Sequence, residues 1–227
     1  MASLLPFRAL RPPPALAARV ASPPYDVVST REARELARGN PDSFLRVSRP
    51  EIDLPEGTDE HADAVYAKGK ENLAELVRRG VLAQDPEPRL YVYAQRMGAH
   101  RQTGLVACAA VDEYDRDIIR KHEKTRADKE DDRVRHIDTL SAHDEPVFLT
   151  YRASAEIDRA VEEVKRAEPE YDLVTADGVG HQLWVVPPSA GARIAALFGQ
   201  VPALYVADGH HRSAAASRVH ARRRALK

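Results

Sequence analysis

The sequence has few of the residues that would assign it to a structural class at once. It contains one cysteine, Cys108, so no disulfide can form within the chain. We predict a buried structural thiol at this position, because it lies in the apolar run TGLVACAAV. The one tryptophan, four phenylalanines and eight tyrosines are too scattered along the chain for a platform on which nucleic-acid bases could stack.

A large net charge and long apolar runs are also missing. The chain carries 34 Lys and Arg against 35 Asp and Glu, a net charge of -1, which gives no reason to expect binding to DNA or to an anionic membrane. No apolar run approaches the length of a membrane span. Prolines interrupt the N-terminal segment where a signal peptide needs a continuous apolar stretch. We therefore expect a cytoplasmic protein with no membrane or nucleic-acid partner.

Helix and strand patterns alternate along the chain. Ser29 or Thr30 can cap a helix over residues 30–40, and an amphipathic pattern predicts a helix over residues 59–79. The other expected strands are 43–53, 89–97 and 102–112 (these two a hairpin), 145–152, 171–177, 181–187 and 203–207, and the other expected helices are 154–168, 192–200 and the segment after 208. This pattern predicts an α+β (mixed α/β) fold, with residues 1–227 in a single domain.

A short polar cluster lies where the strand predicted at 203–207 gives way to a helix. Gly209 permits a tight turn, and the free N–H groups of the helix start attract anions. Arg212 can bind a phosphate with two hydrogen bonds, and His210 and His211 add donors or a proton shuttle. Asp208 can cap the helix or hold a magnesium ion. The cluster predicts a phosphate site, and an ordinary Asp-capped helix with solvated side chains is the alternative.

Zinc is a weaker interpretation of the same cluster. Adjacent histidines on a helix point in different directions, so His210 and His211 are poor joint ligands of one ion.

The second candidate is the charge-dense segment 116–143. Two isoleucines precede its charges, as though a strand or helix delivered them to a cleft. Its candidate residues are His122, Glu123, Thr125, Lys129, Asp132 and Arg133. Glu123 could act as a base or bind magnesium, and Lys129 or Arg133 could neutralise phosphate charge. A solvated helix with alternating charges is the alternative.

Two further segments contribute weaker candidates. Pro23 and Pro24 hold Tyr25 and Asp26 in a stiff, extended setting, where they could contact a substrate or nucleotide, although a core tyrosine beside a turn aspartate fits equally well. Glu51 is a possible acid or base in the segment NPDSFLRVSRPE, whose apolar residues we assign to the core.

Four segments carry a family resemblance: SPPYDVVS, NPDSFLRVSRPE, HEKTRADKEDDR and YVADGHHRSAAA. In this order they resemble the family catalogued as domain of unknown function 1015, from residue 7 onward. The corner YVADGHHR is similar to the phosphate-binding corner of the ParB and sulfiredoxin superfamily, which includes free-serine kinases. Family members are usually longer, so the chain is expected to be a fragment lacking their C-terminal part. They also tend to have a tyrosine soon after the arginine, where this chain has Ser213 and Ala214.

The resemblance implies a ParB/sulfiredoxin-like core and a nucleotide-dependent kinase that phosphorylates the hydroxyl of free L-serine with ATP or ADP and Mg²⁺. The residues that we expect in each role are catalytic Glu123, His122 and Glu51; phosphate-binding Asp208, Gly209, His210, His211, Arg212, Lys129 and Arg133; substrate-binding Tyr25, Asp26 and Thr125; and metal-binding Asp208 and Asp132. A non-catalytic nucleotide-binding regulator of the ParB-like type is the alternative.

Overall fold

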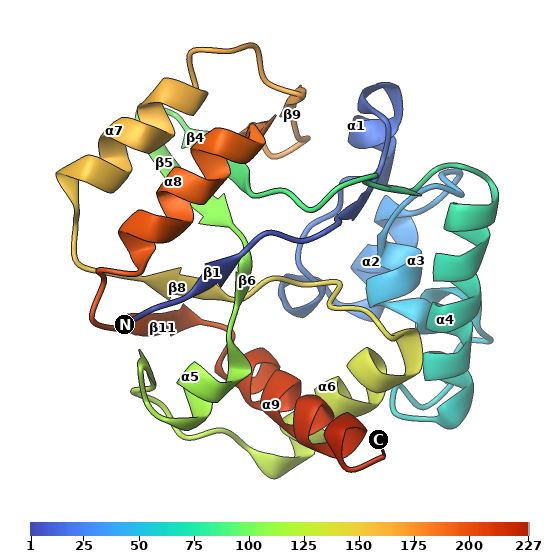
Figure 1. Cartoon of the computed structure of the whole chain (residues 1–227). Coiled ribbons are helices and arrows are strands. Elements are labelled where there is room, and N and C mark those ends of the chain that lie inside the picture. The colour runs from blue at the N-terminus through green and yellow to red at the C-terminus, as the bar shows by residue number, and fades with distance from the viewer. Residues whose placement is uncertain (227) are drawn as a thin grey trace. The chain divides into compact units, whose positions relative to one another are not determined.

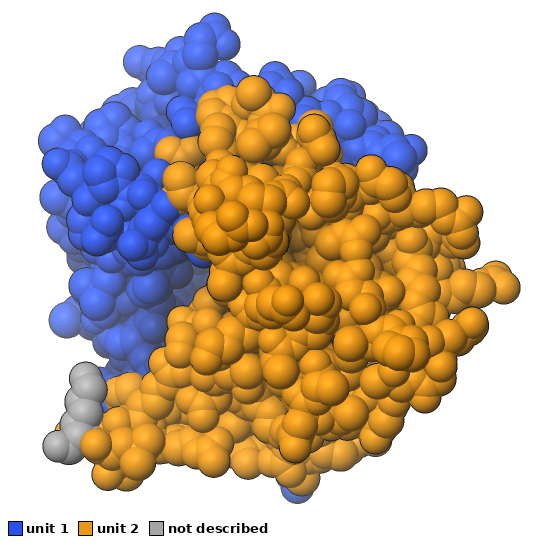
Figure 2. All heavy atoms as spheres, turned by 90° about the vertical axis from the view of Figure 1, so that its right-hand side faces the viewer, with its two compact units in different colours: residues 1–10, 84–124, 147–213 blue, residues 11–83, 125–146, 214–227 orange. Residues whose placement is uncertain are grey.

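The computed structural model of the chain describes residues 1–226 and divides into two compact units. Unit 1 comprises Met1–Leu10, Gln84–Lys124 and Val147–Ser213, and unit 2 comprises Arg11–Ala83, Thr125–Pro146 and the chain from Ala214 onward. Figure 2 colours the two units separately. The observed mixture of helices and small sheets confirms the expected α+β class.

Unit 1 contains two sheets of three or more strands and two helices that cover them (Figure 1). Its elements are β1 (Leu4–Leu5), β4 (Tyr91–Met97), β5 (His100–Val106), β6 (Cys108–Ala109), α5 (Val111–Asp115), β7 (Ile119–Arg120), β8 (Phe148–Thr150), α7 (Ala155–Val164), β9 (Tyr171–Val174), β10 (Gly180–Val185), α8 (Pro188–Phe198) and β11 (Leu204–Asp208). The short strands β2 (Leu10–Arg11) and β3 (Ala83–Gln84) fall at the boundaries of the units.

The sheets of unit 1 combine local and distant strands. The larger one has the order β5-β4-β10-β9 with every pair antiparallel, and it contains the predicted β4–β5 hairpin. The smaller one has the order β7-β11-β8, in which β7 and β11 run parallel. One apolar core joins both sheets to α7 and α8, with Val92, Trp184, Ile157, Ile194 and Val206 among its buried side chains.

Unit 2 is built mainly from helices. Its elements are the 3₁₀ helices η1 (Pro14–Leu16), η2 (Tyr25–Val27) and η3 (Pro50–Asp53) and the α-helices α1 (Ala17–Val20), α2 (Thr30–Leu36), α3 (Leu45–Ser48), α4 (Asp63–Arg78) and α6 (Ala127–Leu140). The helix α9 (His210–Arg224) starts in unit 1 and contributes its later turns to unit 2. Ser29 caps α2 in a capping box with Glu32, as expected from the sequence.

The strand predicted over residues 43–53 is wrong, because this segment forms α3 and η3. Leu45 and Val47 are apolar and two residues apart, which is the spacing of side chains on one face of a strand. Leu45 packs with Ala33, and Val47 packs in a different cluster with Leu76. A helical turn buried on two sides therefore has the same apolar spacing as a strand.

The prediction of a buried thiol is also wrong, because Cys108 is exposed. It lies in the two-residue strand β6, opposite Leu5 of β1, and the side chain of Leu5 is 57% exposed. Residues directly opposite each other in a ladder point to the same face. The face that carries Cys108 is therefore the solvent-facing side of this ribbon.

The helices of residues 1–226 include none that combines the length and apolar character needed to cross a membrane.

Two helical glycines provide a matched test of packing. A Cβ at Gly69 of α4 would lie 2.9 Å from Pro50 Cγ and 3.3 Å from the Val47 carbonyl oxygen, whereas one at Gly191 of α8 would lie 3.9 Å from Leu90. We expect Gly69→Ala to lower the free energy of unfolding by about 1–2 kcal/mol through overpacking. Gly191→Ala should raise it by roughly 0.5–1 kcal/mol through helix propensity. Urea unfolding of both variants measures this difference, and an equal effect of the two would contradict the packing argument.

Candidate functional site

The parallel pair β7 and β11 brings the two main sequence candidates together. Ile119 lies opposite Leu204, and Arg120 lies opposite Tyr205. Parallel neighbours end at the same edge of a sheet. His122 and Glu123, which follow β7, therefore reach the same place as the residues that follow β11.

Gly209 makes the turn from β11 into α9. Its φ is +87°, a backbone conformation that side chains other than glycine rarely adopt. A Cβ here would also lie 3.1 Å from Val147 Cγ1 and 3.2 Å from Arg212 Nε. Glycine is thus required by both the backbone angle and the available space.

The start of α9 has the features of an anion site. The amide of Ser213 donates to the Gly209 carbonyl at 2.8 Å, so the amides of residues 210–212 precede the first helical hydrogen bond. The side chain of Arg212 folds back and donates to Asp208 Oδ2 at 2.5 Å. Asp208 is 67% exposed, and exposed ion pairs contribute little to stability. Arg212 itself is 14% exposed and lies in the first turn of α9, where a bound phosphate could take the place of Asp208.

His210, Glu123 and His122 form a compact cluster at this corner. His210 Nδ1 lies 3.3 Å from Glu123 Oε2. The rings of His122 and His210 meet edge to face, with their centroids 4.5 Å apart. Each of the three residues offers one donor atom within 4.8 Å of the others, and this is the only such group of three or more potential ligands among residues 1–226.

One atom of the cluster has an unmet hydrogen-bonding requirement. The side chain of His210 is only 6% exposed, and its Nε2 has no hydrogen-bond partner among the described residues. With the proton on Nδ1, Nε2 is an acceptor without a donor, and with the proton on Nε2 its N–H has no acceptor. A buried polar atom without a partner costs about 1–3 kcal/mol, which a ligand at Nε2 would offset.

Two imidazoles and one carboxylate form a set of donors that prefers particular metal ions. Three-residue sets of this kind hold catalytic Zn²⁺ and other transition metals while leaving positions open for water or substrate. Mg²⁺ prefers oxygen ligands, and Glu123 alone supplies them in this cluster. The chemistry of the donors therefore fits Zn²⁺ or Mn²⁺ better than Mg²⁺. His211 lies outside the cluster, in agreement with the argument that adjacent helical histidines do not share an ion.

The other predicted site residues lie in unit 2, where two of the segments meet. The guanidinium of Arg133 in α6 lies over the ring of Tyr25 in η2, with its Cζ 4.0 Å from the ring centroid. Arg133 also donates two hydrogen bonds to Asp132, at 2.6 and 2.8 Å. Tyr66 of α4 donates to the same carboxylate at 2.7 Å. The carboxylate of Asp132, which we expected as a metal ligand, thus already accepts hydrogen bonds from Tyr66 and Arg133.

The electrostatics of this group follow from its burial. Burial alone would raise the pKa of Asp132, but the charge of Arg133 and the hydrogen bonds from Tyr66 and Arg133 outweigh it and hold the pKa below its ordinary value. Burial, together with the hydrogen bond to Asp132, raises the pKa of Tyr66. The sequence did not reveal the role of the Tyr66 hydroxyl, because the apolar periodicity that predicts its helix carries no signal for a hydroxyl partner.

The remaining unit 2 candidates have separate surroundings. Glu51 is buried in η3, pairs with Arg49 at 2.8 Å and accepts a hydrogen bond from Thr30 at 3.2 Å. Thr125 donates to Glu130 at the start of α6. Asp26 and Lys129 are exposed.

The metal cluster gives a direct binding prediction. We expect Zn²⁺ to bind the protein, with the affinity lowered more than about tenfold in Glu123→Gln, because one of three protein ligands is weakened. His211→Gln is the matched control and should bind as the wild type does. Isothermal titration calorimetry measures both, and an equal loss in the two variants would show that this cluster is not the ligand set.

Acid sensitivity tests the Asp132 contacts. A carboxyl group whose pKa is depressed by folding stabilises the protein above its unfolded pKa, and this contribution is lost as the pH falls through the folded value. We expect Asp132→Asn to lower the free energy of unfolding at pH 7 by roughly 1–3 kcal/mol and to flatten its decline below about pH 4.

The neighbouring Asp131 provides the control for this prediction. It is 61% exposed and paired with Arg218 at 2.6 Å, so Asp131→Asn should cost less than about 1 kcal/mol. Urea unfolding between pH 2 and pH 7 measures both variants. An unchanged pH profile in Asp132→Asn would contradict the assignment.

Comparisons with known proteins place the chain in a family. No curated protein and no solved structure matches it. The family described as "Protein of unknown function (DUF1015)" matches residues 4–227. That match spans nearly the whole sequence and agrees with the resemblance carried by the four segments, so the chain belongs to the DUF1015 family.

Proposed function

We propose that the protein is a nucleotide-dependent kinase that phosphorylates the hydroxyl of a small molecule, free L-serine, with a ParB/sulfiredoxin-like core around the corner of β7, β11 and α9. The observation that carries the proposal is the position of Glu123 beside His210 at the start of α9. A carboxylate that can take a proton thereby lies next to a helix start that attracts phosphate.

The phosphate groups of ATP or ADP would bind to the amides that begin α9. Gly209 leaves the main chain open to a ligand, and Arg212 would turn from Asp208 to the phosphates. Bound with the nucleotide, Mg²⁺ would neutralise phosphate charge, and the phosphate oxygens suit it as ligands. Phosphoryl transfer requires mainly positioning and charge neutralisation, which these groups supply.

Glu123 is the base in this proposal, in the state of the cluster in which no metal ion holds its carboxylate. The serine Oγ attacks the terminal phosphorus, the bond from that phosphorus to the nucleotide oxygen breaks, and Glu123 takes the proton of the hydroxyl. Glu123 is 64% exposed, so a substrate can reach it, and its Oε2 lies 3.3 Å from His210 Nδ1. His122 packs against His210 and keeps the ring of His210 in place.

The unit 2 residues Tyr25, Asp26, Thr125, Lys129 and Arg133 are proposed as contacts to the substrate or nucleotide. Lys129 is exposed. Arg133 is fixed by Asp132 and Tyr25, so its charge is held in one place.

A nucleotide-binding regulator without turnover is the second candidate. The amides of residues 210–212, which precede the first helical hydrogen bond of α9, support it, because nucleotide binding needs these groups and not a base. Such a regulator needs the start of α9 but does not need Glu123 as a base.

The test is formation of O-phosphoserine from L-serine with ATP or ADP and Mg²⁺, followed by ³¹P NMR. We expect turnover in the wild type and a loss of kcat of roughly 10²–10⁴-fold in Glu123→Gln, with KM for the nucleotide little changed, because the base acts on the hydroxyl rather than in nucleotide binding. Glu168→Gln, at an exposed position of unit 1, is the matched control and should retain full activity.

The absence of product with both nucleotides would refute the kinase proposal. If calorimetry still detects nucleotide binding in the wild type and in Glu123→Gln, the regulator is the correct alternative. If Arg212→Gln binds nucleotide as tightly as the wild type, the corner is not the phosphate site.

A further inference from the structure

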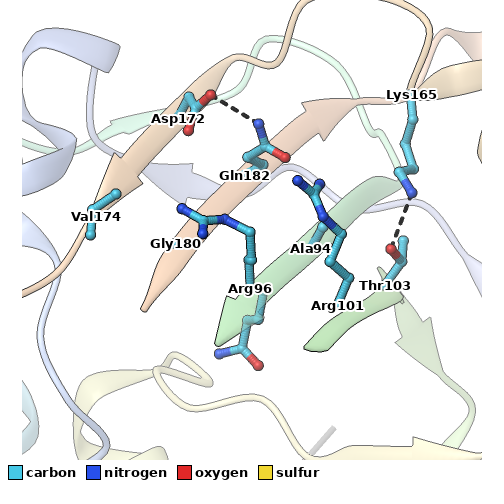
Figure 3. Close-up of a pocket in the computed structure, with 10 residues that line it drawn as sticks. Ala94, Arg96, Arg101, Thr103, Lys165, Asp172, Val174, Gly180 and Gln182 are labelled. Carbon is cyan, nitrogen blue, oxygen red and sulfur yellow. Dashed lines mark hydrogen bonds between the residues drawn. The ribbon is translucent and has the colours of Figure 1, made fainter. Parts of the chain in front are cut away.

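A groove of about 350 Å³ lies on one face of the sheet β5-β4-β10-β9 in unit 1 (Figure 3). Two neighbouring rows of residues form its floor. One row runs across the four strands as Val174, Gly180, Arg96 and Arg101, and the other runs as Asp172, Gln182, Ala94 and Thr103. Residues two apart on a strand share a face, so both rows point to the same side of the sheet.

The groove lies where the core-facing side of the sheet extends beyond its helix. Val92 and Trp184, two residues further along β4 and β10, are buried in the core against α7. The helix ends at Val164, and Lys165 follows it at the rim of the groove. The sheet face therefore changes from apolar to cationic at the point where α7 no longer covers it.

Two arginines at the centre of the groove lie at opposite positions of neighbouring strands, and neither is paired with a carboxylate among the described residues. Arg96 and Arg101 occupy directly opposite positions on β4 and β5, where like charges are destabilising. Neither guanidinium has a carboxylate within 4.0 Å among the described residues. Figure 3 shows the guanidinium of Arg96 directed toward Gly180 and that of Arg101 directed toward Gln182, both over the same face of the sheet. Such a pair is stabilised when an anion lies between the two charges.

The residues around the two arginines determine the space and the charge of the groove. Gly180 has no side chain, so the guanidinium of Arg96 lies 3.5 Å from the position that a Cβ would take. Lys165 Nζ lies 3.3 Å from Thr103 Oγ1 on the other side of the groove. The one carboxylate of the lining, Asp172, accepts a hydrogen bond from Gln182 at 2.9 Å. Lys165 also pairs with Glu162 Oε1 at 2.7 Å, so Arg96 and Arg101 are the two cations of the lining without a paired carboxylate in residues 1–226.

We propose that this groove binds the phosphate group of a small molecule. A guanidinium matches two phosphate oxygens at once, and a pair of guanidiniums suits a group with two negative charges. The volume is in the range of small-molecule sites. The lining has no aromatic ring on which a nucleic-acid base could stack. The site lies on other strands than the corner of β7 and β11, so the two can succeed or fail separately.

The test is a titration of the ¹⁵N-labelled full chain with pyrophosphate, followed through the amide signals of Gly180 and Gln182. We expect saturable shifts, and in the double variant Arg96→Gln/Arg101→Gln the affinity should fall by roughly tenfold or more because two charge-assisted contacts are lost. Shifts at Gly209 report binding at the α9 corner separately. Arg159→Gln, at an exposed position of α7, is the control and should leave the affinity unchanged.

A second variant keeps the test independent of folding. Arg101→Glu turns the repulsive pair into an attractive one, so it should raise the midpoint of thermal unfolding while abolishing the shifts at Gly180 and Gln182. The proposal is overturned if these amides do not shift, if their shifts do not saturate, or if either variant binds pyrophosphate as the wild type does.

Discussion

The parallel pairing of β7 with β11 is the constraint on which the candidate site depends. The two strands are separated by more than 80 residues of sequence, and β7 is only two residues long. Their alignment nevertheless places Glu123 within 3.3 Å of His210. Pairing the two strands closes a loop of the intervening chain, and this closure has a cost in chain entropy. The shared core with α7 and α8 provides the burial that offsets this cost.

Local signals were sufficient for much of the fold. The capping box at Ser29, the β4–β5 hairpin and the helix α4 follow from patterns within a few residues, although α4 begins at Asp63, four residues later than expected. The strand expected at 43–53 failed because two separate clusters bury the two sides of one turn. Periodicity records which residues are buried and cannot distinguish one core from two.

The sequence predicts which residues belong to the candidate site but not how they are arranged in space. The turn at Gly209 and the helix after it could be read from the sequence, since glycine and a helix start have local causes. Two contacts join segments that are distant in the sequence: His122 with His210, and Tyr25 with Arg133. A single sequence does not show how such segments align with each other. The groove on the sheet was missed for a related reason, because Arg96 and Arg101 are unremarkable until the hairpin sets them opposite each other.

The positive φ of Gly209 has a consequence for comparing members of the family. Because both the backbone angle and the nearby Val147 and Arg212 exclude a side chain, this one position reports on the whole corner. A relative with any other residue there must turn its chain differently and aim the first amides of α9 elsewhere. Reading one letter at this place would therefore sort the DUF1015 family into chains that keep the corner and chains that have rebuilt it.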